Sequence, residues 1–221
     1  MASTVKYISP LQFITMDESP YTHLQQVAMA CEAGADWIQL RMKQIADDDF
    51  VQVATEAKKI CDSYNSKLII NDRVHIVKTV GAYGVHIGKE DMPVNEARAI
   101  LGDEMIVGGT ANTADDIEKH YWNGADYIGL GPYRFTTTKK KLSPVLGLEG
   151  YAAIMRSLKL KQVELPVVAI GGIQLPDVEA LVQAGVHGVA FSGLLVHAEN
   201  RREVYDSLQD GLLKISGEEG E

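Results

Sequence analysis

The sequence predicts a closed (β/α)8 barrel, or TIM barrel, of the α/β class, formed by a single domain over residues 1–215. Eight short apolar runs recur along the 221 residues, and stretches with helical spacing separate them. Eight such units leave about 27 residues each, which fits a compact barrel. A doubly wound open sheet is the alternative, because periodicity alone does not distinguish the two. The last six residues, SGEEGE (216–221), are expected to form a disordered acidic tail.

The predicted strands are nearly continuous in Val, Ile and Leu, which is typical of parallel strands covered on both faces. They span residues 11–15, 36–41, 67–72, 83–88, 105–110, 127–131, 166–172 and 188–193. Helical spacing is clear in the stretches 21–34, 47–64, 95–102, 113–124, 176–185 and 197–215. A glycine that can end a helix precedes four of the strands, namely Gly34, Gly81, Gly124 and Gly185.

The composition is that of a soluble globular protein, with 46% hydrophobic and 23% charged residues. The net charge of −9 argues against nucleic acid and anionic membranes as partners, because both favour a basic surface. No apolar run approaches the roughly 20 residues that cross a bilayer. The two cysteines, Cys31 and Cys61, have no metal-motif spacing, so we expect reduced thiols and a cytoplasmic protein without a secretory signal. A homo-oligomer is left open.

Polar residues follow the predicted strands at the end where a TIM barrel carries its chemistry. After the second run, Gln39, Arg41 and Lys43 alternate with apolar residues, which places them on one side of an extended backbone. The remaining strand ends contribute Asn71 and Asp72, Asp91, Thr110, the cluster Thr136, Thr138 and Lys139, the pair Gly171 and Gly172, and finally Phe191 and Ser192. We expect all of these residues at one barrel mouth.

Two chemistries are visible among these residues. The cationic side chains, the hydroxyls and the glycine turns offer donors to phosphate oxygens. Asp72 and Asp91 add two carboxylates, which suit Mg²⁺ carried with a phosphorylated small molecule. Taken singly, Arg41 could be a solvated surface group and Asp72 could cap the following helix. Polar residues follow most of the predicted strands, however, and this clustering favours a binding or catalytic site. His86, within an apolar run, is expected to be a hydrogen-bonded residue of the core or mouth.

Several motifs resemble, in the same order, those of the thiamine phosphate synthase (thiamine-phosphate pyrophosphorylase) family. They are QLRMK (39–43), IINDR (69–73), GVHIGKEDMPV (84–94), IGLGPYRFTTTKK (128–140), VAIGGI (168–173) and the Phe191-Ser192 pair. The resemblance covers most of the chain and implies a TIM-barrel transferase. Its reaction would join a hydroxymethylpyrimidine pyrophosphate to a thiazole phosphate and release pyrophosphate.

The resemblance also implies roles for individual residues. Asp72 and Asp91 match the Mg²⁺ ligands, and Thr110 stands where Ser is usual. Arg41, Lys43 and Lys139 would be catalytic, because they meet the charge on the departing pyrophosphate. The other substrate-binding positions are Gln39 and Asn71 around the pyrimidine and its pyrophosphate, and Thr136, Thr138, one glycine of Gly171-Gly172, Phe191 and Ser192 around the thiazole phosphate.

Three positions depart from the family pattern. Asn112 stands where many members have His, Lys89 where Gln is common, and Tyr133-Arg134-Phe135 replaces an aromatic-Pro lead into the threonine cluster. Two alternatives therefore stay open: a thiazole tautomerase-like isomerase, which would need one phosphate site and an acid/base pair, and a non-catalytic phosphate-ligand-binding paralogue. The missing His argues against the first, and the retained carboxylates and Lys139 argue against the second.

Overall fold

The computed structural model describes residues 6–135 and 144–213 and shows a closed barrel of eight parallel strands in sequence order. The strands are β1 (Leu11–Ile14), β2 (Trp37–Leu40), β3 (Lys67–Asn71), β4 (Gly84–Ile87), β5 (Ile106–Ala111), β6 (Tyr127–Leu130), β7 (Val167–Ala169) and β8 (Gly188–Phe191). The predicted closed barrel is confirmed, and the open-sheet alternative is wrong because β1 pairs with β8.

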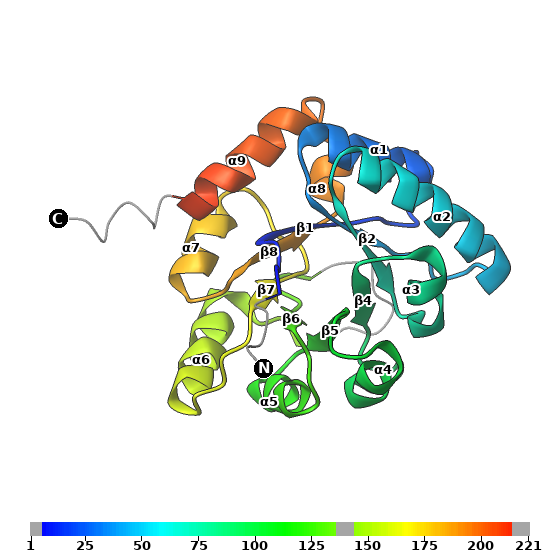
Figure 1. Cartoon of the computed structure of the whole chain (residues 1–221). Helices are drawn as coiled ribbons and strands as arrows, with labels where there is room; N and C mark the ends of the chain where they lie inside the picture. Colours follow the sequence, from blue (N-terminus) through cyan, green and yellow to red (C-terminus); the bar gives the residue numbers. More distant parts are fainter. Residues whose placement is uncertain (1–5, 136–143, 214–221) are drawn as a thin grey trace.

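Helices form a ring around the strands (Figure 1). They are α1 (His23–Ala33), α2 (Asp47–Ser63), α3 (Val74–Val80), α4 (Val94–Leu101), α5 (Ala114–Trp122), α6 (Gly147–Leu160), α7 (Asp177–Gln183), α8 (Gly193–Val196) and α9 (Arg201–Leu213). The six helical stretches named from the sequence correspond to α1, α2, α4, α5, α7 and α9. The four glycines predicted to end helices all have positive φ. The predicted tail 216–221 lies outside the described residues.

The pleat of the strands determines which side chains fill the barrel. Alternate residues point inward, and the inner cluster is built from Ile8, Ile14, Trp37, Ile69, Ile106, Tyr127, Val168 and Ala190. Two residues beyond Trp37 and Ile69, on the same face, stand Gln39 and Asn71. The apolar interior is therefore covered by polar side chains toward the carboxyl ends of the strands.

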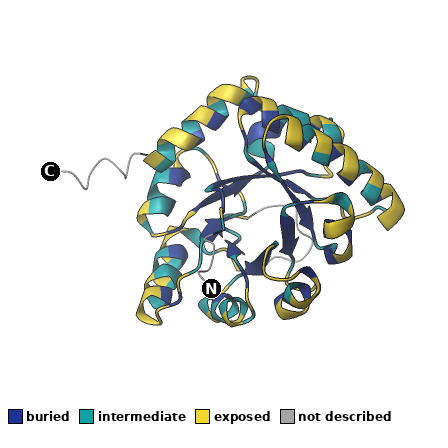
Figure 2. Cartoon of the chain, viewed as in Figure 1, coloured by how far each residue is buried: buried dark blue, intermediate teal, exposed yellow. Residues whose placement is uncertain are grey.

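A second, larger core lies between the strands and the helices. The outward-facing strand residues, among them Ile38, Leu40 and Leu68, pack there against the buried faces of the helices. Figure 2 shows this layering, with dark blue strands in the centre and helices whose exposed faces are yellow. Both faces of each strand are covered, which explains why the strand sequences are continuous apolar runs.

The barrel closes where the first strand meets the last. Leu11 pairs with Val189 and Phe13 with Phe191. Pro10 approaches Gly188 so closely that a β-carbon at Gly188 would lie 1.9 Å from the Pro10 carbonyl oxygen. Only glycine leaves room for this approach, so the seam depends on the residue at position 188.

Candidate active site at the barrel mouth

Two carboxylates and one ammonium group meet between the ends of β2, β3 and β4. Lys43, in the loop after β2, contacts Asp72 Oδ2 with its Nζ atom, which also lies 4.0 Å from Asp91 Oδ2. Asp72 follows β3 directly, and Asp91 lies in the turn between β4 and α4. The structure thus brings together three of the residues that the sequence placed at separate strand ends.

The backbone around Asp72 and Gly88 makes this meeting possible. Asp72 adopts a left-handed conformation with φ of 63°, which aspartate tolerates better than most residues. Its Oδ1 accepts a hydrogen bond of 3.0 Å from the Gly88 N–H. A β-carbon at Gly88 would lie 2.3 Å from Asp91 Oδ2 and 3.3 Å from Asp72 Oδ1. Glycine at this position therefore lets both carboxylates approach the same point.

The two carboxylates differ in their electrostatic environment. Burial alone would raise the pKa of Asp72, but Lys43, Asp91 and the Gly88 N–H hold that pKa below its usual value. Burial, a hydrogen bond with Asp72 and the charge of Asp72 raise the pKa of Asp91. The pair is therefore a concentration of negative charge that a cation would relieve.

A divalent metal ion fits this donor set. Mg²⁺ usually takes one or two carboxylates and completes its shell with water and substrate phosphates. Asp72 and Asp91 supply two carboxylates that converge over Gly88. Within residues 6–135 and 144–213, no group of three or more His, Cys, Asp or Glu side chains is placed to hold a metal. Asp72 and Asp91 could hold such an ion if water and substrate phosphates complete its shell.

Arg41 is held beside the same mouth by an acidic residue that the sequence analysis did not single out. Its Nη1 lies 3.6 Å from Asp17 Oδ2, and His23 Nε2 lies 3.3 Å from the other oxygen of Asp17. Burial lowers the pKa of His23, while Asp17 acts in the opposite direction. The Arg41 backbone N–H also donates to Thr15 Oγ1 at 2.9 Å. The only sequence signal for Asp17 is its position shortly after the first apolar run.

A chain of buried hydrogen bonds lies beneath the mouth. His86 Nδ1 is 3.0 Å from the Tyr127 hydroxyl, and His86 Nε2 is 3.0 Å from Thr110 Oγ1. Burial raises the pKa of Tyr127, while a hydrogen bond with Gln39 acts in the opposite direction. The chain connects Tyr127 to Thr110, a predicted substrate-binding residue, through the histidine expected to be hydrogen-bonded in the core or mouth. Tyr127 was missed because it stands within an apolar run.

The remaining predicted residues that the structure describes lie at or just after the ends of β3, β7 and β8. Asn71 is the last residue of β3 and donates its amide N–H to Asp72. The Gly171-Gly172 turn follows β7, and Ser192 precedes α8. The Phe191 side chain packs against Phe13 and Tyr205 in the outer core, so any contact with a ligand would come from its backbone. The predicted residues Thr136, Thr138 and Lys139 lie outside the described residues.

Two of the positions that depart from the family pattern contact each other. Lys89 Nζ lies 3.4 Å from Asn112 Oδ1 and 2.8 Å from Asp116 Oδ2. The Asn112 amide N–H donates to the Gly131 carbonyl at the end of β6. Asn112 therefore contacts the protein backbone at the position where the family often has histidine.

The third departure holds the turn after β7. The Arg134 backbone N–H donates to the Gly171 carbonyl at 2.9 Å, and its Nη1 donates to the Gly172 carbonyl at 3.1 Å. Its guanidinium also binds both carboxylate oxygens of Asp177, with Nη2 2.6 Å from Oδ1. Arg134 thus ties the Gly171-Gly172 turn to the start of α7.

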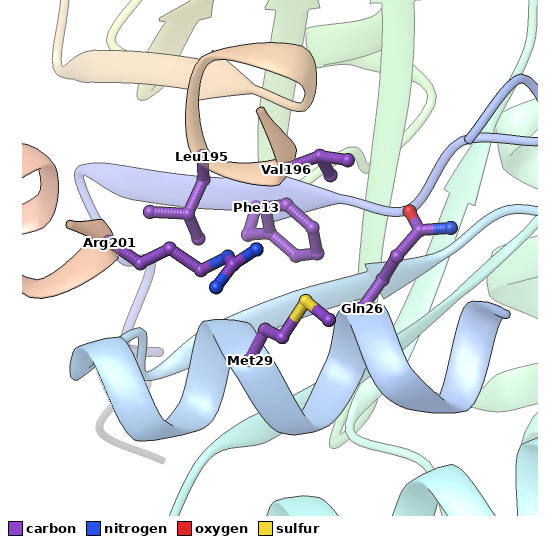
Figure 3. Close-up of a pocket in the computed structure, with 6 residues that line it drawn as sticks. All are labelled: Phe13, Gln26, Met29, Leu195, Val196 and Arg201. Carbon is purple, nitrogen blue, oxygen red and sulfur yellow. The ribbon is translucent and has the colours of Figure 1, made fainter. Parts of the chain in front are cut away.

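Two hollows lie away from this mouth. A crevice between α1, β1 and α8 is lined by Phe13, Gln26, Met29, Leu195, Val196 and Arg201 (Figure 3), and it has no room for a water molecule. A cavity of about 300 Å³ lies among residues at the amino-terminal ends of β3, β4 and β5, including Lys67, Tyr83 and Met105. It is therefore at the opposite end of the barrel from the carboxylates.

Over the described part of the chain, no helix is long and apolar enough to cross a membrane.

Comparisons with known proteins agree with the motifs found at the mouth. A family model described as thiamine monophosphate synthase matches residues 11–195. The thiamine-phosphate synthase of Bacteroides thetaiotaomicron is 50% identical over 190 residues, which cover 86% of this chain and 91% of that protein. The thiamine-phosphate synthase of Phocaeicola vulgatus is 51% identical with the same coverage.

Solved structures give the same result. The thiamine phosphate pyrophosphorylase from Pyrococcus furiosus has a TM-score of 0.81 and 29% sequence identity, covering 94% of this chain and 96% of that chain. A 3-hexulose-6-phosphate synthase, with a TM-score of 0.69 and 16% identity, shares the fold. The chain therefore belongs to the thiamine monophosphate synthase family, whose members are transferases that form thiamine phosphate.

Proposed function

We propose that this transferase condenses hydroxymethylpyrimidine pyrophosphate with thiazole phosphate and releases pyrophosphate. The bond from the pyrimidine methylene carbon to the pyrophosphate oxygen breaks, and a bond from that carbon to the thiazole nitrogen forms. The observation that carries the proposal is the convergence of Lys43, Asp72 and Asp91 at the barrel mouth, where cationic and anionic groups can hold a metal-loaded diphosphate together.

The diphosphate half of the site is assigned to β2, β3 and their loops. Lys43 and Arg41 would bind oxygens of the departing group and neutralise the charge that develops on it. Asn71 would donate to the same group, and Lys139 is assigned to it by family resemblance. Mg²⁺ held by Asp72 and Asp91 would supply further positive charge at the leaving oxygen.

The two organic halves are assigned to the centre and the far side of the mouth. Gln39 near the end of β2 and Thr110 near the end of β5 would hold the pyrimidine. Backbone N–H groups of the Gly171-Gly172 turn and of Phe191-Ser192 would bind the thiazole phosphate together with Thr136 and Thr138.

The reaction requires little acid–base chemistry from the protein. The attacking thiazole nitrogen carries no proton, so no strong general base is needed. The electron-rich aminopyrimidine can delocalise the positive charge left when pyrophosphate departs. The protein's main contributions would be to stabilise the leaving group and to hold the two substrates in line.

One assay tests the proposal. The purified protein is incubated with both substrates, with and without Mg²⁺, and both pyrophosphate and thiamine phosphate are measured. We expect both products in equal amounts, and only with the metal. Turnover of a thiazole phosphate alone without metal would instead indicate the isomerase, and tight binding without turnover would indicate a non-catalytic binder.

A further inference from the structure

Arg73 belongs to the IINDR motif, yet its side chain is directed away from the carboxylates. Its Nε lies 2.9 Å from Asp47 Oδ1, its Nη1 donates to the Met42 carbonyl at 2.9 Å, and its Nη2 donates to the Ile45 carbonyl at 3.0 Å. The side chain is only 14% exposed. Because each of its three nitrogens has a protein partner, Arg73 is poorly placed to bind a phosphate group.

The partners of Arg73 enclose the loop that carries Lys43. Met42 and Ile45 lie on either side of Lys43, in the segment between β2 and α2 that has neither strand nor helix structure. The residue that precedes α2, Ala46, provides no side-chain cap. The guanidinium of Arg73 therefore supplies hydrogen bonds that regular secondary structure does not provide in this loop.

Arg73 is itself fixed from two further directions. Its guanidinium carbon lies 4.4 Å from the centre of the Phe50 ring, and Phe50 is fully buried in α2. Asp47, in the first turn of the same helix, binds its Nε. A planar guanidinium can make these contacts at once, whereas an ammonium group has no such fork of donors. The loop is thus held to α2 and to the end of β3 by one side chain.

We propose that Arg73 is a positioning residue, which holds the β2–α2 loop so that Lys43 stands beside Asp72 and Asp91 before a diphosphate binds. The inference rests on the proposed function. Lys43 has a long flexible stem, so the position of its ammonium depends on where the loop backbone is held. Displacement of a charge-stabilising group by about 1 Å can lower a rate by as much as 100-fold.

The test measures the affinity for inorganic pyrophosphate in Mg²⁺ by calorimetry, in a double-mutant cycle with Lys43. Arg73→Met keeps an apolar stem against Phe50 but removes the donors, and Arg73→Lys keeps the charge without the fork. We expect either change to weaken pyrophosphate binding about tenfold when Lys43 is present and less than twofold in a Lys43→Met background. The KM for the thiazole phosphate should not change, whereas a general structural role would affect both substrates.

His75→Ala is the matched control. His75 Nε2 lies 2.8 Å from Asp47 Oδ2, so this change removes a neighbouring partner of Asp47 but leaves the loop carbonyls bonded to Arg73. Its pyrophosphate affinity should equal that of the wild type. The inference is overturned if the Arg73 changes lower the pyrophosphate affinity equally with Lys43 present and in the Lys43→Met background. It is also overturned if a folded Arg73→Lys protein binds pyrophosphate as tightly as the wild type. If the protein binds pyrophosphate but forms no thiamine phosphate, the proposed function is wrong. The double-mutant cycle would still measure the coupling between Arg73 and Lys43.

Discussion

At the scale of single residues, Asp72 and Asp91 act on each other unequally, because Asp72 raises the pKa of Asp91 whereas a hydrogen bond with Asp91 lowers the pKa of Asp72. Burial and Asp72 raise the pKa of Asp91, whereas the contacts of Asp72 with Lys43 outweigh its burial and lower its own pKa. A protein loses some stability by keeping such a pair of carboxylates at its barrel mouth. Such pairs are nevertheless common where binding or catalysis needs the negative charge.

Asp91→Asn should therefore change activity and stability in opposite directions. Turnover should fall roughly 100-fold or more, because a carboxylate that we propose as a ligand of Mg²⁺ is lost. The melting temperature at pH 7 should stay the same or rise, because a repulsive charge is removed. Steady-state rates over a range of Mg²⁺ concentrations and thermal unfolding check this, with Glu104→Gln, at an exposed position before β5, as control. A lower melting temperature would show that Asp91 supports the fold instead.

The sequence predicted these residues because each stands in the segment that follows a strand, where the barrel geometry determines its place. It could not predict the partners of Arg73, because two of them are backbone carbonyls, which any residue type would provide. The Tyr127–His86 pair was hidden for a different reason. A tyrosine whose hydroxyl forms a hydrogen bond inside the barrel has the same apolar neighbours in sequence as a tyrosine that only packs in the core. Only the fold shows which polar groups the hydroxyl of Tyr127 contacts.

At the scale of elements, the helices show where sequence patterns are informative. The long α2 and α9 have clear helical spacing. In contrast, α3 has only seven residues, VHIVKTV, and four of them are β-branched valine or isoleucine, which favour strands intrinsically. It is a helix because it must cross from β3 to β4 on the outside of the barrel. Tertiary context thus overrode local preference there.

The start of α7 offers a test of one ion pair. Burial alone would raise the pKa of Asp177, but the Arg134 guanidinium and the Gln174 N–H hold it below its usual value. Because the pKa is lower in the folded state, the stabilisation is complete above the unfolded-state pKa of about 4 and is lost as the pH falls through the folded-state pKa.

We therefore expect Asp177→Asn to lower the free energy of unfolding by about 1–2 kcal/mol at pH 7 and by less at pH 3. Urea unfolding at both pH values measures the difference. Asp48→Asn is the matched control, because Asp48 is also an aspartate in a first helical turn but is exposed. A loss for Asp177→Asn that is equal at both pH values would mean that the carboxylate charge is not what stabilises the turn.

At the scale of the whole molecule, the seam between β1 and β8 decides whether the barrel closes. Gly188→Ala should lower the free energy of unfolding by at least about 3 kcal/mol, because the added methyl group would overlap the Pro10 carbonyl. Gly193→Ala is the comparison, since a β-carbon there would lie 3.4 Å from the His197 ring, an ordinary contact. Chemical denaturation of both variants measures the effect, and equal stability would show that the seam can widen without loss.

The pairing of Leu11 with Val189 also affects how the chain is made. During synthesis the first strand leaves the ribosome long before its partner at the other end of the chain has been translated. Until then the nascent chain has one edge of its sheet unpaired, and such an edge can pair with other chains. The final pairing spans almost the full polypeptide, and contacts between such distant segments form slowly. The pairing of β8 with β1, which follows its translation, therefore ends the period in which the newborn protein depends most on protection from aggregation.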